Sequence, residues 1–439
     1  MPVPQRSRLL VPALAALAAC GGATAERARD GAPNVLLISI DTLRADHLGC
    51  YGYEKPTSPA LDAFARTAVV FEEAQASASW TLPSLASALT SEYSSTHGCW
   101  NFGSTLDESF LTLPEILVAA GYDTGCAASH IFVTTRHGLQ QGIVHTDDSY
   151  AYPEIEPDKA VTSQVIADKG IRFLDQKAAS PEREPWFLWL HFFDPHEDYL
   201  QHAGITEQFA TPGQPPAPIE LYDGEIRYTD LHFGRVLEAL DRTGFTANTM
   251  VVVVSDHGEE FMDHGGLRHG HTLYRELVRV PLLIRAPGIA PSRVHELVRT
   301  VDLLPTVLDI VGLPSPAGIA GRSLVPRMRG EPEEVLPALA EIALSEPLTM
   351  DSVITERVKL VQHASGDVRE LYDLEKDLLE RQDLHAERPD EAERLSSLLA
   401  ELKARAAERS RTAPELVFTP GQLDDLRKLG YGGGSAVER

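Results

Sequence analysis

The chain has 439 residues, of which 43% are hydrophobic, so it can bury at least one large core. Its 39 Lys and Arg residues against 64 Asp and Glu residues give a formal net charge of −25. A negative field of this size excludes nucleic acid and an anionic membrane surface as expected partners, because it repels both. An anionic substrate would therefore have to be attracted by local positive charge, such as that of a metal ion.

The N-terminus is predicted to be a lipoprotein signal peptide over residues 1–20, followed by a linker over residues 21–32. Arg6 and Arg8 precede the apolar run LLVPALAALAA, and Cys20 follows it, which is the layout of a secretory signal. The string LAAC that ends at Cys20 resembles the lipobox of bacterial lipoproteins, in which the Cys is lipidated after cleavage. An ordinary signal peptide with an incidental Cys is the alternative.

Membrane attachment is expected only through this lipid anchor on Cys20. No other apolar run approaches the ~20 residues that a membrane-spanning helix needs. We therefore expect the protein in the bacterial cell envelope, lipid-anchored at a periplasmic or outer-membrane face.

Three further cysteines, Cys50, Cys99 and Cys126, lack the CxxC spacing of thiolate zinc sites. We expect structural burial for them, with one disulfide at most.

From about residue 33, short β-rich runs alternate with longer helical stretches. This alternation predicts an α/β fold with a mostly parallel central sheet covered by helices on both faces. Continuous apolar runs at 34–40, 186–193 and 249–255 are typical of strands buried on both faces. Charged residues follow each run, and because ligands gather at the carboxyl ends of such strands, these groups are expected to converge in one crevice.

The later part of the chain is predicted to add a small antiparallel sheet and a helix. The Pro- and Gly-rich stretch 205–220 is predicted to be a surface loop. The runs SVITERVKLVQH and VRELYDL, within residues 352–374, are predicted to pair as antiparallel strands. The spacing of apolar residues predicts an amphipathic helix over 387–409. The expected organisation is a catalytic domain at 33–335, a C-terminal sheet and helix at 336–410, and a tail at 411–439.

The string SDHGEEFMDHGG, at residues 255–266, holds an unusual density of carboxylates and imidazoles. Asp256 and His257 directly follow a predicted strand, and Asp41 follows another. Two carboxylates and an imidazole form a ligand set suited to Ca²⁺, Zn²⁺ or Mn²⁺. The alternatives are a turn or cap role for Asp41 and structural roles for individual histidines.

Thr81 opens the string WTLPSLASALTS, which is predicted to be a helix with Thr81 as its N-cap and Pro83 in the first turn. Capping alone would explain this residue. A hydroxyl at a helix N-terminus is also placed to attack an anionic ester, since the free N–H groups there stabilise negative charge.

The string HFFDPHEDY offers His191, Asp194 and His196 after a buried strand. We favour His196 over His191 for proton transfer or substrate contact, because strand alternation directs Asp194 and His196 into the loop.

Taken in order, these strings resemble the sulfatase family of the alkaline phosphatase superfamily. NVLLISIDTLRADHLGCYGY resembles its opening strand and first metal motif, WTLPSLASALTSEYSSTHG its nucleophile helix, and HFFDPHEDY its Pro–His loop. SDHGEEFMDHGG, LYRELVRVPLLIRAPG, VDLLPTVLDIVGLP and GIAGRSLVP match later landmarks, and ELYDLEKDLLERQDL resembles the C-terminal strand and turn. The resemblance covers about residues 33–330 and implies the fold expected above.

The resemblance also implies roles for individual residues. One divalent metal ion, Ca²⁺ or Zn²⁺ with Mn²⁺ as a further choice, would be held by Asp41, Asp256 and His257. The catalytic residues would be Thr81, His196 and His269, and the substrate-binding residues His271 and Asp194.

Three positions depart from the sulfatase pattern. Thr81 stands where the family has a Cys or Ser that becomes formylglycine, so no formylglycine is expected. Leu85 replaces the Arg of that motif, and Thr42 replaces the second Asp of an acidic pair. Related phosphonate ester hydrolases tolerate a neutral residue at the latter position, and nucleotide phosphodiesterases and phosphoethanolamine transferases are similar in using a metal-bound Thr.

The sequence thus predicts a metal-dependent hydrolase of sulfate or phosphate esters that uses Thr81 as nucleophile. Its expected substrate is a sulfated or phosphorylated glycan, lipid or small ester. The alternatives are a phosphoryl-group transferase of the same superfamily and a catalytically silent envelope lipoprotein that binds a sugar or partner.

Overall fold

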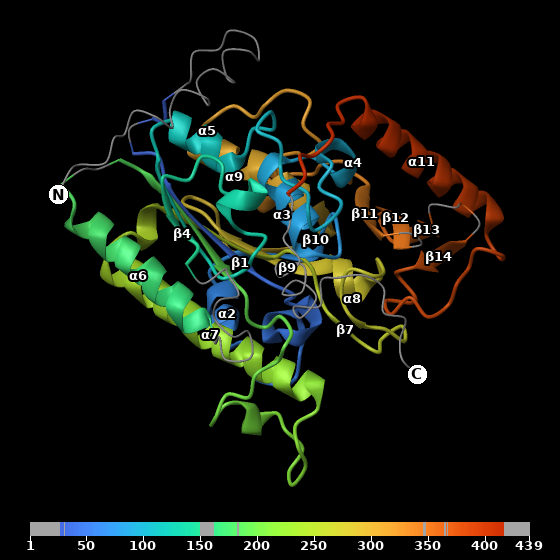
Figure 1. The fold of residues 1–439 in the computed structure, drawn as a ribbon, viewed down its shortest axis with the longest axis horizontal. Helices are drawn as coiled ribbons and strands as arrows, with labels where there is room; N and C mark the ends of the chain where they lie inside the picture. The colour runs from blue at the N-terminus through green and yellow to red at the C-terminus, as the bar shows by residue number, and fades with distance from the viewer. Residues whose placement is uncertain are drawn as a thin grey trace.

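The computed structural model describes residues 27–29, 31–149, 162–181, 184–345, 348–363, 366 and 368–416. They form a large α/β body with a smaller sheet and a long helix at one side (Figure 1). Cys20 and the predicted signal peptide lie outside the described residues, so the lipid anchor stays a prediction. None of the described helices combines the length and apolar character that spanning a membrane requires.

The main sheet has eight strands in the order β10-β2-β9-β6-β1-β5-β3-β4. β9 pairs antiparallel with both its neighbours, and every other neighbouring pair is parallel, which confirms the predicted mostly parallel sheet. The strands are β1 (Asn34–Ile40), β2 (Val69–Gln75), β3 (Asp123–Ala128), β4 (His145–Asp147), β5 (Trp186–Phe192), β6 (Thr249–Ser255), β9 (Arg279–Arg285) and β10 (Ser292–Arg299).

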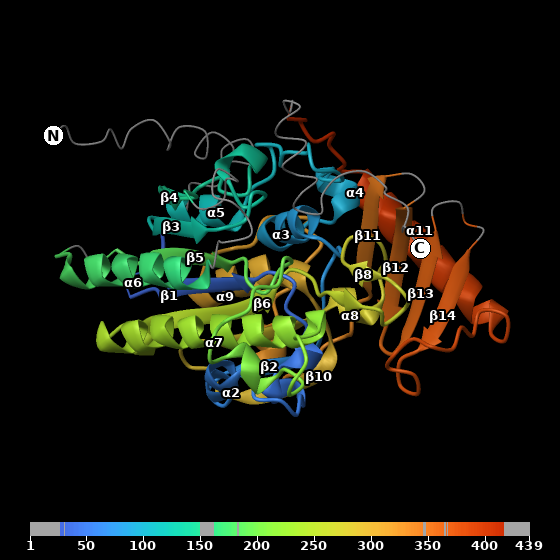
Figure 2. The same ribbon diagram turned by 60° about the horizontal axis from the view of Figure 1, so that its bottom comes forward.

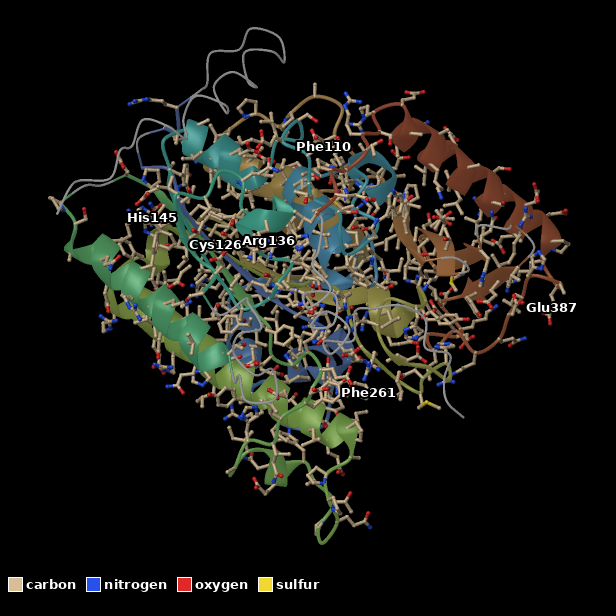
Figure 3. All side chains as sticks on the ribbon, in the orientation of Figure 1. Phe110, Cys126, Arg136, His145, Phe261 and Glu387 are labelled. Atoms are coloured by element: carbon tan, nitrogen blue, oxygen red, sulfur yellow. The ribbon has the colours of Figure 1, made fainter. Side chains whose placement is uncertain are left out.

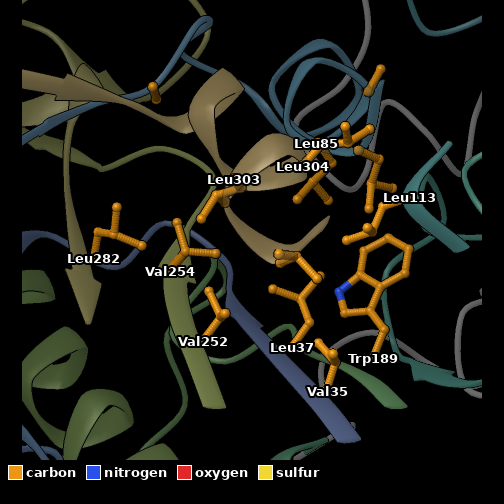
Figure 4. Close-up of a cluster of buried hydrophobic side chains, with 14 of the residues drawn as sticks. Val35, Leu37, Leu85, Leu113, Trp189, Val252, Val254, Leu282, Leu303 and Leu304 are labelled. Carbon is orange, nitrogen blue, oxygen red and sulfur yellow. The ribbon is translucent and has the colours of Figure 1, made fainter. Parts of the chain in front are cut away.

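Helices cover both faces of this sheet (Figure 2). One face carries α2 (Pro59–Ala65), α6 (Ser163–Ala179) and α7 (Pro218–Arg242), and the other carries α3 (Thr81–Thr90), α5 (Leu113–Ala119) and α9 (Leu303–Val311). Strand alternation explains this arrangement, because Leu36 and Ile38 pack with the first group while Val35 and Leu37 pack with the second (Figure 4).

The C-terminal layer is an antiparallel sheet of four strands covered by one helix. Leu395 and Leu399 of the helix pack against Val353, Leu360 and Leu371 of the sheet. The run SVITERVKLVQH, predicted as one strand, is a hairpin, because the chain turns at Glu356 with a positive φ of 48°. The elements are β11 (Ala338–Ser345), β12 (Leu348–Thr355), β13 (Val358–His363), β14 (Arg369–Asp373) and α11 (Pro389–Ala407).

Short elements complete the described fold. Helix α7 begins at Pro218, inside the stretch 205–220 that was predicted to be a loop, because a proline fits the first turn of a helix. Cys50, Cys99 and Cys126 are unpaired, and Cys126 is buried within β3 (Figure 3). The remaining strands and α-helices are α4 (Ser94–His97), β7 (Glu260–Phe261), β8 (Leu267–Arg268), α8 (Arg275–Val278) and α10 (Val325–Met328).

Candidate active site

The carboxyl ends of the three central strands bring the candidate site together. β1 lies between β5 and β6, so Asp41 at the end of β1 is flanked by both neighbouring strand ends. The Asp41 amide donates to the Phe192 carbonyl at 2.9 Å, and the Leu43 amide donates to Ser255 Oγ at 2.9 Å. These bonds fix the loop after β1 against the ends of β5 and β6.

Asp41, Asp256 and His257 form one buried cluster, as the metal-site prediction requires. His257 Nε2 lies 3.4 Å from Asp41 Oδ1 and 3.5 Å from Asp256 Oδ2. One ligand atom from each of the three residues lies within 4.8 Å of the other two. Within the part of the chain that the structure describes, Asp41 Oδ1 and Asp256 Oδ2 accept no hydrogen bond.

Buried carboxylate oxygens without partners are costly unless a cation takes them up. Two hard carboxylate oxygens and one imidazole nitrogen suit Ca²⁺, Zn²⁺ or Mn²⁺. The cluster therefore fits a single divalent metal ion by its chemistry and by its unsatisfied oxygens. Thr42, which follows Asp41, is also buried, and its hydroxyl has no hydrogen-bond partner among the described residues.

The protein alone leaves this cluster electrostatically unbalanced. Burial raises the pKa of Asp41 well above its usual value, and the charge of Asp256 raises it further. Burial lowers the pKa of His257, but the carboxylates of Asp256 and Asp41 outweigh this effect and raise it overall. The cluster thus attracts positive charge, which either a proton or a metal ion can supply.

Thr81 places its hydroxyl beside this cluster. Thr81 is the first residue of α3 and Trp80 is the N-cap, so the predicted capping position was wrong by one residue. The Trp80 side chain makes no capping bond, and Thr81 Oγ1 lies 3.3 Å from His257 Nε2. Ser84, one turn further along α3, donates to the Asp256 carbonyl at 2.6 Å and holds the helix against the segment after β6.

His191 is oriented by a chain of hydrogen bonds. Trp189 Nε1 donates to Ser39 Oγ at 2.8 Å, and an indole N–H can only donate. His191 Nε2 faces Asp41 Oδ2 at 3.3 Å, and because an ionised carboxylate can only accept, Nε2 carries the proton and Nδ1 accepts from the Ser39 hydroxyl at 2.8 Å. Burial lowers the pKa of His191 to about 4, which keeps the ring neutral at pH 7. Sequence reasoning favoured His196, but the structure places His191 directly against Asp41, a predicted metal ligand.

His196 and His269 lie side by side next to this cluster. Their ring centroids are 4.9 Å apart, and the ring of His269 lies 4.4 Å from that of His257. His269 Nδ1 is 2.9 Å from Glu259 Oε1. Burial and the neighbouring His269 lower the pKa of His196 to about 3, and burial also lowers that of His269, so both are neutral at pH 7.

The two residues predicted to bind substrate have other contacts. His271 Nε2 pairs with Glu260 Oε2 at 2.7 Å. The Asp194 carboxylate accepts from the Ser163 amide at 2.7 Å and from the Thr162 hydroxyl at 3.0 Å, so it satisfies the N-terminus of α6. Asp194 is thus bonded at the N-terminus of α6, and its substrate-binding role stays a prediction.

Sequence reasoning missed His130, which is buried at the site. Its Nε2 lies 3.8 Å from Asp41 Oδ2, and its ring lies 5.6 Å from that of His196. Asp41, His130 and His191 form a second group whose atoms are close enough to hold a metal ion. His130 follows β3, which ends at the same edge of the sheet, but the sequence of β3, DTGCAA, lacks the continuous apolar run that marked the other strands.

Comparisons with known proteins found similar families, chains and folds. The Sulfatase family profile matches residues 33–313, and the profile for the C-terminal region of N-sulphoglucosamine sulphohydrolase matches residues 264–409. A Delta 4,5-hexuronate-2-O-sulfatase of Bacteroides thetaiotaomicron is 26% identical over 453 residues, covering 88% of this chain and 90% of the relative.

Two solved structures share the fold. One is a protein in complex with its substrate D-glucosamine-2-N,6-O-disulfate, with a TM-score of 0.72 and 20% identity, covering 86% of this chain and 98% of that chain. The other is the phosphonate monoester hydrolase of Agrobacterium radiobacter, with a TM-score of 0.72 and 22% identity, covering 85% of this chain and 96% of that chain.

Proposed function

Since this chain belongs to the sulfatase family, we propose that it hydrolyses a sulfate or phosphate ester with Thr81 as the nucleophile and one divalent metal ion as cofactor. The observation that carries this proposal is the position of Thr81 Oγ1, 3.3 Å from His257 Nε2 and beside the unsatisfied oxygens of Asp41 and Asp256. A hydroxyl with only a capping role has no need of that position.

Asp41, Asp256 and His257 would hold the metal ion. His257 Nδ1 lies 2.9 Å from the Gly258 carbonyl, which can only accept, so Nδ1 donates and the lone pair of Nε2 faces the cluster. His191 donates to Asp41 and keeps that carboxylate in place. When bound, the metal would lower the pKa of the Thr81 hydroxyl and screen the charge of the ester.

The reaction proceeds in two displacements at the sulfur or phosphorus atom. Thr81 Oγ1 bonds to the central atom as the bond from that atom to the leaving oxygen breaks, and the proton of the Thr81 hydroxyl ends on the leaving oxygen, which departs as the alcohol. Water then attacks the same atom and releases Thr81. His269 is suited to accept the proton of that water, because its Nδ1 donates to Glu259 and its Nε2 is therefore unprotonated in the neutral ring.

The substrate is proposed to be a sulfated glycan fragment or a small sulfate or phosphate ester. The relative named above is a sulfatase of unsaturated hexuronate, one fold neighbour holds a glucosamine disulfate, and the other is a phosphonate monoester hydrolase. These names support a monoester of a sugar or small alcohol as the first substrate class to test. An ester-bearing lipid is a further candidate.

The proposed location is the bacterial cell envelope, with acyl chains on Cys20 as the anchor. The lipobox-like LAAC string and the apolar run before it support this proposal. Mass spectrometry of the N-terminal peptide from membranes should find an acylated Cys20. A Cys20→Ser variant that remains in the membrane fraction would contradict the proposal.

The activity is tested with the protein lacking residues 1–20, incubated with aryl sulfate, phosphate monoester, phosphate diester and phosphonate ester in the presence of Ca²⁺, Zn²⁺ or Mn²⁺. We expect one ester to be hydrolysed and Thr81→Ala to lower its kcat by about 10⁴-fold or more. Ser396→Ala, on the outer helix α11, is the matched control and should retain full activity.

The alternatives give different results in the same assay. A transferase would release the alcohol only when an acceptor alcohol is added. A silent binding protein would hydrolyse no ester with any of the three metals, and that result would contradict the proposed function.

A further inference from the structure

A fully buried ion pair in the C-terminal layer contacts the start of α8, which packs against the loop that carries the candidate active site. Lys359 of β13 and Glu380, in the turn after β14, have side chains that are 0% and 1% exposed. Lys359 Nζ lies 2.8 and 3.0 Å from the two carboxylate oxygens of Glu380. Glu380 Oε2 also accepts from the Arg275 amide at 2.9 Å, so the pair holds the start of α8.

His264 makes a second connection between the same segments. Its Nδ1 lies 2.7 Å from Glu276 Oε1, and its Nε2 lies 3.0 Å from the carbonyl oxygen of Glu380. An ionised carboxylate and a backbone carbonyl can only accept, so both ring nitrogens must donate. Only the imidazolium form of His264 satisfies both bonds. The ring also stacks on Tyr274, with centroids 3.8 Å apart.

The segment held by His264 lies directly on the metal-binding residues. The Gly258 amide, next to His257, donates to the Leu277 carbonyl at 2.8 Å. A Cβ atom on Gly258 would lie 1.9 Å from the Glu276 carbonyl oxygen, so the backbone of α8 touches the loop without space for a side chain. A shift of Glu276 and Leu277 would therefore move Gly258 and the residues before it.

We propose that His264, together with the Lys359–Glu380 pair, is a positioning group that uses the C-terminal sheet to hold the loop from Asp256 to His271. In this role, His264 contacts neither the substrate nor the metal ion. It acts through Glu276 and Glu380 on the backbone beside His257. The catalytic part of this inference rests on the proposed function, whereas the positioning part does not.

Charged and titratable groups face His264 from each element packed against it. Glu276 lies on α8, Glu380 in the turn after β14, and Glu260 on β7, where its carboxylate accepts from the His264 amide. Tyr274 lies against the ring. Burial lowers the pKa of His264, but the hydrogen bond and charge of Glu276 outweigh it and raise that pKa above its usual value.

This shift fixes the direction of the pH dependence. Because the pKa of His264 is raised in the folded protein, the stabilisation that His264 gives the loop is complete below its unfolded-state pKa of about 6.5. This stabilisation is lost as the pH rises through the folded-state pKa. The loop should therefore be held more firmly at pH 6 than at high pH. A variant without an imidazole should not show this change.

The test compares wild type with His264→Phe, which keeps a ring on Tyr274 but cannot make the two hydrogen bonds. Amide hydrogen exchange of peptides within residues 256–271 is measured at pH 6 and pH 8. We expect exchange at pH 6 to be about tenfold faster in His264→Phe than in wild type, and the ratio to be smaller at pH 8. His295→Phe is the matched control, because it removes an exposed pair between His295 on β10 and Glu72 on β2. We expect no change of exchange in the same peptides.

Activity gives an independent measure if an ester is hydrolysed. His264→Phe should lower kcat by about tenfold and change KM by less than twofold, because misplacement of the loop affects chemistry more than binding. Glu276→Gln, which keeps the side-chain volume, should weaken the pH dependence of exchange in the same peptides. This second variant tests the proposal if His264→Phe fails to fold.

The outcomes separate this inference from the proposed function. Exchange that is equal in wild type and His264→Phe at both pH values would overturn the positioning role, whatever the activity. Faster exchange in His264→Phe, in a protein that hydrolyses no ester, would support the positioning role and count against the proposed function alone.

Discussion

Two regions of this protein bury carboxylates completely, and they treat them in opposite ways. Both oxygens of Glu380 are within 3.0 Å of Lys359 Nζ, and one also accepts the Arg275 amide. At the ends of β1 and β6, Asp41 and Asp256 each keep one buried oxygen that accepts no hydrogen bond from any described residue. Since burial without a partner costs free energy, the difference supports a structural role for Glu380 and a ligand-binding role for Asp41 and Asp256.

The largest effect on stability is expected when the Lys359–Glu380 pair is broken. Lys359→Met leaves the Glu380 carboxylate buried without its cation, so the free energy of unfolding should fall by about 3–5 kcal/mol. Urea unfolding of the two proteins measures this difference. Arg357→Met breaks an exposed pair with Glu375 just before β13 and should cost less than about 1 kcal/mol. Equal losses in the two variants would show that burial of the Lys359 pair has no special role.

A change of opposite sign is expected at the unsatisfied cluster. Asp41→Asn removes a buried negative charge whose oxygen lacks a hydrogen bond, so the metal-free protein should gain about 1–3 kcal/mol in unfolding free energy. Asp223→Asn is the matched control, because that buried carboxylate is bonded by His47, Tyr53 and Lys55, and the variant should be less stable than wild type.

Metal addition should reverse this order. A divalent ion at 100 times its dissociation constant should stabilise wild type by about 2.7 kcal/mol and leave Asp41→Asn almost unchanged. Thermal unfolding with chelator and then with Ca²⁺, Zn²⁺ or Mn²⁺ makes the comparison. If chelator has the same effect on both proteins, Asp41 is not a metal ligand.

The smallest effect on the metal site is expected at Ser39, which contacts the cluster of Asp41, Asp256 and His257 only through His191. Ser39→Ala removes the hydroxyl that fixes the His191 ring, so the affinity for the metal should fall by about tenfold. It also leaves the buried Trp189 Nε1–H without its acceptor, so the free energy of unfolding should fall by about 1–3 kcal/mol. Calorimetric titration with the metal measures the affinity. If Ser39→Ala binds the metal with wild-type affinity, the orientation of His191 does not affect metal binding. The metal site would then depend only on Asp41, Asp256 and His257.

The sequence was sufficient to predict the fold class and the proximity of three of the residues at the site. Continuous apolar runs marked β1, β5 and β6, and the carboxyl-end rule for parallel strands predicted that Asp41, Asp256 and His257 would lie close together. Their roles as ligands, like those of Thr81 and His269, stay predictions until they are measured.

Other features depend on contacts between distant segments. Asp194 follows a strand as Asp41 does, but the N-terminus of α6 takes up its carboxylate. His130 follows β3, whose mixed composition gave no signal of a central strand. His264 and Glu380 are 116 positions apart, and no local pattern in either segment indicates their contact.

The proposed reaction depends most directly on Thr81, and trapping a covalent intermediate on this residue is the most direct test of the proposal. Wild-type protein is mixed with the ester that it hydrolyses, quenched in acid within one turnover, digested, and analysed by mass spectrometry. We predict a sulfo or phospho group on Thr81 in wild type and none in Thr81→Ala, which should no longer turn over. Full turnover by Thr81→Ala, or an adduct on another residue, would contradict the account.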